Sequence, residues 1–68
     1  MARYYVNRQA QSNGDHEVHR SDCYWLPSPE NRVDLGEHTG CHSAVRTAKT
    51  IFPQSNGCRT CSTECHTT

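Results

Sequence analysis

Cysteine and histidine are the residues that most restrict how this chain can fold. Five cysteines and five histidines occur within 68 residues, while only 32% of the residues are hydrophobic. A chain of this length buries little apolar surface, and such small domains commonly depend on disulfides, a metal ion or a partner for stability. We therefore expect the cysteines and histidines, more than a large core, to hold this chain together.

The pair Cys58-x-x-Cys61 is the strongest metal-binding signal. Two thiols at this spacing can bind one ion, because the turn between them directs both sulfurs inward. Two further ligand residues, His19 and Cys23, lie four positions apart far upstream. We predict that these four residues form one closed tetrahedral site for a single zinc ion, since soft thiolates favour zinc over magnesium or calcium. Closing so long a loop couples metal binding to folding.

The C-terminal Cys65-His66 offers an alternative set of ligands. Either residue could replace His19 as the fourth ligand, and both together with Cys58 and Cys61 would give a local site that does not close the long loop. Cys58 and Cys61 also match a thiol redox motif, but the thioredoxin-like motif belongs to a βαβ setting, whereas here the pair follows the only predicted helix. A closed four-ligand site has no free position for substrate. We therefore expect that the protein is not an enzyme. The less favoured alternative is a thiol redox enzyme that uses Cys58 and Cys61.

The N-terminal residues contain no apolar run long enough for a signal peptide, and no stretch is suited to span a membrane. Without export, we expect the protein to be cytoplasmic. In the reducing cytosol, cysteine clusters bind metals more often than they form disulfides. The odd cysteine count also argues against a complete disulfide framework. Cys41 is accordingly expected to be a free thiol that packs in the core as a small hydrophobic residue.

Periodicity predicts a single α+β domain over residues 1–68, ordered over roughly 3–64. It comprises a β-hairpin or three-stranded antiparallel sheet, one helix and the Cys-x-x-Cys turn. The expected elements are strands at 3–7, 16–20 and 31–35, a helix at 39–52 and a turn at 54–57. Asn13-Gly14 marks the hairpin turn, Gly36 ends the third strand, and Gly57 supplies an unusual backbone angle in the last turn.

The predicted helix rests on apolar residues spaced three and four apart, which places them on one face. These residues are Cys41, Ala44, Val45, Ala48 and either Ile51 or Phe52. Thr39 is the expected N-cap and Pro53 the expected stop.

Charge gives little indication of a partner. Seven basic and seven acidic residues leave a formal net charge of zero, and no basic stripe typical of a nucleic-acid binder is present. Aromatic residues beside Arg20 could stack on single-stranded nucleic acid, but in so small a core they are expected to be buried. They are Tyr4, Tyr5, Tyr24 and Trp25. We expect a monomeric module that binds a protein or DNA partner and no membrane.

The segments HRSDC (19–23) and CRTC (58–61), with a helix between them, resemble the metal-binding module of the Ada family, over roughly residues 4–61. The resemblance implies a hairpin, a helix and a zinc site, and it implies DNA association as an alternative function. In that family of bacterial proteins, the first ligand of this set is a cysteine that accepts a methyl group from a DNA phosphotriester. The matching position here is His19, whose imidazole lacks the soft anionic sulfur that this reaction needs. The resemblance therefore implies the fold and the metal without the methyl transfer.

Overall fold

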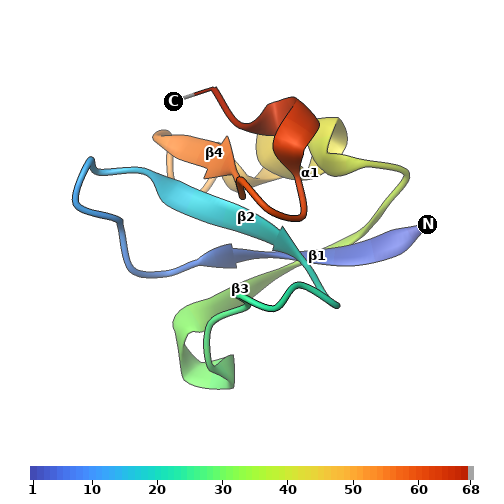
Figure 1. Ribbon diagram of the computed structural model, residues 1–68, viewed down its shortest axis with the longest axis horizontal. Helices are drawn as coiled ribbons and strands as arrows, with labels where there is room; N and C mark the ends of the chain where they lie inside the picture. The colour runs from blue at the N-terminus through green and yellow to red at the C-terminus, as the bar shows by residue number, and fades with distance from the viewer. Residues whose placement is uncertain (68) are drawn as a thin grey trace.

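The computed structural model describes residues 1–67 as a four-stranded mixed sheet with one α-helix on it (Figure 1). The strands are β1 (Ala2–Asn7), β2 (His16–Arg20), β3 (Arg32–His38) and β4 (Ser55–Gly57); the helices are α1 (Cys41–Ala48) and the short 3-10 helices η1 (Pro29–Asn31) and η2 (Thr63–Cys65). The strand order is β3-β1-β2-β4, in which β1 pairs antiparallel with β2 and β3, while β4 pairs parallel with β2. The predicted α+β class is confirmed, and the sheet has one strand more than expected.

The hairpin of β1 and β2 has the predicted turn. Gly14 has a φ of +92°, a conformation that glycine adopts without steric cost. The Asn13 side-chain oxygen accepts a hydrogen bond of 2.9 Å from the backbone N–H of Asp15, which fixes the turn locally. This hairpin delivers His19 to the far end of β2.

The prediction that Gly36 ends the third strand is wrong, because β3 continues to His38. The pairing register with β1 shifts opposite Gly36, between Tyr4 and Tyr5, so the strand contains a bulge. Gly36 has a φ of +82°, and its N–H donates to the Asp34 side chain at 2.8 Å. A glycine in this conformation bends a strand and increases its twist without ending it.

Helix α1 is shorter than the predicted 39–52, and Gly40 instead of Thr39 is its N-cap residue. The backbone N–H groups of Ile51 and Phe52 still bond to the Ala48 carbonyl, so the chain turns tightly after the helix. Phe52 is the residue that packs against the core and stacks on the His16 ring, with centroids 4.0 Å apart. Ile51 is exposed.

Residues 55–57 form strand β4 instead of the predicted turn, and they pair with β2 from His16 to Val18. Gly57 is required here for space rather than for an unusual backbone angle. A Cβ atom at this position would lie 2.6 Å from the Cys65 Cβ and 2.7 Å from the Ser62 carbonyl oxygen. The C-terminal segment therefore packs directly on the backbone of β4.

The two faces of the sheet have different tasks. Val6 and Val18 form a cross-strand pair and belong to the buried cluster that α1 covers. Successive residues of a strand point to opposite faces, so His19 points away from this cluster. The core and the predicted metal ligands are thus on opposite sides of β2. Within residues 1–67, no helix has both the length and the apolar character needed to cross a membrane.

Candidate metal centre

The structure brings the four predicted ligand residues together. His19 lies near the end of β2 and Cys23 in the turn that follows, while Cys58 comes directly after β4 and Cys61 in the next turn. One potential ligand atom from each lies within 4.8 Å of those of the other three. Binding of an ion at this cluster stays a prediction, but its donor atoms are assembled.

Pairing of β2 with β4 explains how two distant parts of the chain meet. Val18 lies beside Gly57 in the parallel register, and the Cys58 N–H donates to the Val18 carbonyl at 2.9 Å. The residues that follow, His19 on β2 and Cys58 directly after β4, are therefore neighbours on the same face. The fourth strand, which the sequence pattern did not predict, thus positions half of the cluster.

The spacing of the sulfur atoms suits a tetrahedral ion. The Sγ atoms of Cys23 and Cys58 are 3.8 Å apart, and both residues are free cysteines. In a tetrahedral site with zinc–sulfur bonds of about 2.3 Å, two sulfurs are separated by about 3.8 Å. The observed separation is the one that a shared zinc ion requires.

Each of the three cysteine sulfurs accepts a backbone hydrogen bond. The donors are the N–H groups of Arg20 (to Cys61, 3.2 Å), Trp25 (to Cys23, 3.4 Å) and Thr60 (to Cys58, 3.4 Å). Hydrogen bonds from N–H groups favour the ionised acceptor and fix its orientation, as in the outer shell of metal sites. The backbone is therefore arranged to stabilise three thiolates.

His19 carries an unpaired nitrogen. Its side chain is only 1% exposed, and Nδ1 has no hydrogen-bond partner among the described residues. The other nitrogen, Nε2, lies 3.6 Å from the Glu17 carboxylate. A buried polar atom without a partner costs about 1–3 kcal/mol, so an occupant for Nδ1 is needed.

Burial shifts the pKa of two of the candidate ligands, His19 and Cys23. It lowers the pKa of His19, although Glu17 opposes this effect, and the neutral ring is the form that binds metals. Burial raises the pKa of the Cys23 thiol to about 12, and the nearby thiols of Cys61 and Cys58 add to this, while the Trp25 N–H opposes it. Several thiolates in this space need a cation to compensate their charge.

The local alternative set of ligands is not assembled. Cys65 is bonded to Cys41, and the Nδ1 atom of His66 lies 3.0 Å from the Gly57 carbonyl oxygen. Neither Cys65 nor His66 belongs to the four-residue cluster. The structure therefore favours His19 as the fourth ligand.

The expectation that Cys41 is a free thiol is wrong. Cys41 is buried on the core face of α1, as its position in the helical pattern predicted, but it forms a disulfide with Cys65. The two residues are 24 positions apart and meet because η2 packs against α1. No local pattern in the sequence indicates this pair.

The prediction that all the tyrosines and Trp25 are buried is also wrong. Tyr4 is in the core, but Tyr24 is 86% exposed and Trp25 is 61% exposed. Their rings are 5.0 Å apart, edge to face, directly after the candidate ligand Cys23. Trp25 also lines a cavity of about 270 Å³, together with Arg59, Thr60, Glu17 and Cys58. An exposed aromatic pair therefore lies beside the metal cluster.

Comparisons with protein-family models, curated proteins and solved structures found no match. The resemblance to the Ada family rests on the residues at 19–23 and 58–61 alone.

Proposed function

We propose that this chain is a structural zinc-binding module, with one zinc ion held by His19, Cys23, Cys58 and Cys61. The convergence of these four residues from two distant segments carries the proposal. The 3.8 Å separation of two sulfurs, the three N–H···S bonds and the unpaired Nδ1 of His19 support it.

The donor set selects the type of metal. Three sulfurs and one imidazole are soft and borderline ligands, which favour zinc over calcium or magnesium. The Nδ1 atom of His19 is the nitrogen available to the ion, while Nε2 lies 3.6 Å from the Glu17 carboxylate. Four protein ligands leave no position for water or substrate, so the role of the ion is structural and the module is not catalytic.

The exposed pair Tyr24–Trp25 is the surface that this module presents to a partner. Zinc binding at Cys23 fixes the turn from which both aromatic rings project, and the Trp25 N–H is bonded to that same sulfur. Aromatic side chains that project from a rigid base lose little entropy when they bind. This arrangement supports a binding module for a protein or nucleic-acid partner.

DNA association in the manner of Ada-like proteins is the second candidate. Trp25 and Arg59 line the same cavity, which offers a stacking surface beside a cation. Arg20, the other candidate cation, donates a hydrogen bond of 2.6 Å to the Asp22 carboxylate. The electrostatic attraction for a nucleic acid is therefore small, and a protein partner is favoured.

Metal analysis of the purified chain tests the proposal. We expect one tightly bound zinc ion per chain that His19→Ala and Cys58→Ser release, with loss of dispersed amide signals in the NMR spectrum after chelation. His66→Ala is the matched control, because this residue was the alternative ligand, and it should retain the ion. Release by His66→Ala but not by His19→Ala would show that the ligand set is wrong.

Binding of short DNA, measured by a mobility shift at several salt concentrations, separates the two kinds of partner. A shift that weakens with salt and is lost in Trp25→Ala supports DNA association. No shift at low salt supports a protein partner.

A further inference from the structure

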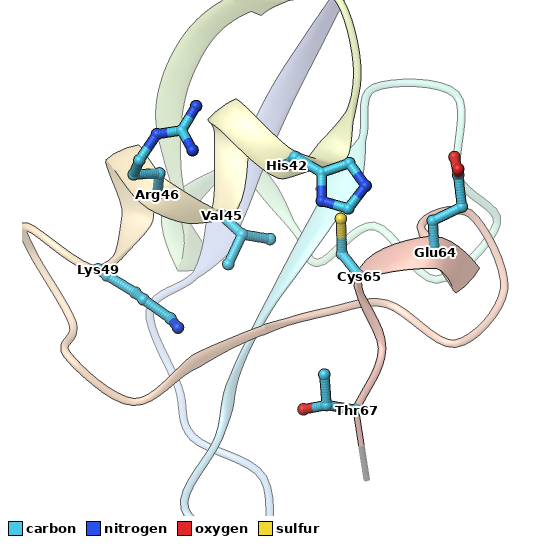
Figure 2. A pocket seen from close by; sticks show the side chains of 7 residues that line it. All are labelled: His42, Val45, Arg46, Lys49, Glu64, Cys65 and Thr67. Atoms are coloured by element: carbon cyan, nitrogen blue, oxygen red, sulfur yellow. The ribbon is translucent and has the colours of Figure 1, made fainter.

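The disulfide lies beside a cavity on the other side of the molecule's core. Figure 2 shows the side chains that line this cavity, which lie on α1 and on the C-terminal segment. The cavity has a volume of about 380 Å³. Its lining residues are His42, Val45, Arg46, Lys49, Glu64, Cys65 and Thr67. It shares none of them with the four-residue metal cluster.

A second group of metal-ligand atoms lies at this cavity. The sulfurs of Cys41 and Cys65 and a ring nitrogen of His42 are all within 4.8 Å of one another. Both cysteines are buried, whereas His42 is exposed, and in Figure 2 its ring lies next to the Cys65 sulfur. In the oxidised chain the two sulfurs are bonded to each other and are not available to a metal.

We propose that reduction of the Cys41–Cys65 disulfide creates a second metal site, formed by Cys41, His42 and Cys65 and opening into the cavity. A dithiol reductant transfers two electrons to the sulfur–sulfur bond and becomes a disulfide, while its two protons pass to Cys41 and Cys65. A zinc ion then displaces these two protons and binds the two thiolates and the imidazole. Oxidation by a disulfide reverses the electron transfer and releases the ion.

The packing around the two cysteines keeps them close after reduction. Cys65 is held by the hydrogen bond from its N–H to the Ser62 carbonyl and by close packing on the backbone of Gly57, which has no side chain in the way. Cys41 is the first residue of α1, so its backbone is fixed by the helix. Rotation of the two side chains can then bring the Sγ atoms of Cys41 and Cys65 to the separation of about 3.8 Å that a tetrahedral ion requires.

The second site differs from the first in its coordination. Only three protein ligands converge, so a fourth position faces the cavity, as in zinc sites that keep an open position. The Glu64 side chain also lines this cavity. The site therefore takes a thiophilic divalent ion only in the reduced chain.

Zinc stoichiometry of the full chain, measured with and without a phosphine reductant in oxygen-free buffer, tests this inference. We expect the reduced chain to bind one equivalent more than the oxidised chain. In reduced His42→Ala, affinity for this additional equivalent should fall at least about tenfold. Arg46→Ala is the matched control, because Arg46 is exposed on the same helix and lines the same cavity but offers no metal ligand.

The difference between oxidised and reduced chain separates the second site from the first. Failure of the four-residue cluster to bind zinc would remove one equivalent from both forms and leave the difference intact. No additional equivalent on reduction overturns the second site, as does an unchanged affinity in His42→Ala. Cobalt substitution gives an independent readout, because a thiolate charge-transfer band should grow on reduction and be smaller in the Cys41→Ser/Cys65→Ser variant.

Discussion

Reduction of the Cys41–Cys65 disulfide should lower the free energy of unfolding by about 3.5 kcal/mol. The disulfide joins residues 24 positions apart, and breaking this crosslink restores about 12 cal/mol/K of conformational entropy to the unfolded chain. If a zinc ion joined Cys23, Cys58 and Cys61, the path from Cys41 to Cys65 through the ion would be of similar length, so the metal would not replace the constraint. A chain of 68 residues is stable by roughly 3–10 kcal/mol, so reduction removes a third or more of the total.

Urea unfolding followed by circular dichroism measures this difference. One equivalent of zinc should be present throughout, so that the first cluster is filled and no metal is left to stabilise the reduced cysteines. In thermal unfolding followed by the same signal, the melting temperature should fall by roughly 15–25 °C on reduction. The Cys41→Ser/Cys65→Ser variant is the control, because reductant should leave its stability unchanged. A difference below about 1 kcal/mol between oxidised and reduced wild type would refute the argument from loop closure.

Three further changes test the packing by the same unfolding measurement. Gly57→Ala should lower the free energy of unfolding by about 3 kcal/mol or more, because the new Cβ atom meets backbone and Cβ atoms at 2.6–2.8 Å. Gly36→Ala is the control: its new Cβ atom has open space, so only the positive φ should cost roughly 1–2 kcal/mol. Equal losses in the two variants would contradict the close approach at β4. The buried Asp15 carboxylate accepts hydrogen bonds from the side-chain amides of Gln54 and of Asn56 on β4, so Asp15→Ala should lower stability by about 1–3 kcal/mol. Unchanged stability would show that these hydrogen bonds do not hold β4 in place. Trp25→Ala should change stability by less than about 0.5 kcal/mol because the ring is exposed, and a larger loss would mean that it packs in the fold.

The parts of the fold that the sequence predicted are those encoded by local patterns. The hairpin follows from alternation and from Asn13-Gly14, and the buried face of α1 follows from spacings of three and four. The candidate ligands also follow from local pairs, His19 with Cys23 and Cys58 with Cys61, whose spacing suits a shared ion.

The parts that the sequence did not predict depend on contacts between distant residues. Strand β4 has the sequence Ser-Asn-Gly, which has no preference for a strand, and its position beside β2 is fixed instead by bonds to Asp15 and by the tail packed on Gly57. The Cys41–Cys65 pair likewise exists only because η2 packs against α1. Composition suggested that every aromatic residue is needed in the core, but the small side chains Ala44 and Ala48 fill the space under the helix.

Gly57 and Cys58 connect the two candidate metal sites. Cys58 is a candidate ligand in the four-residue cluster on one face of the sheet, while Gly57, one position earlier, lies against Cys65 on the other face. Because Gly57 and Cys58 are consecutive, rotation of the Cys65 side chain against Gly57 after reduction acts on the backbone that positions Cys58. Affinity of the first cluster for zinc should therefore be higher in the oxidised chain than in the reduced chain, and equal affinities would show that the strand isolates the two sites.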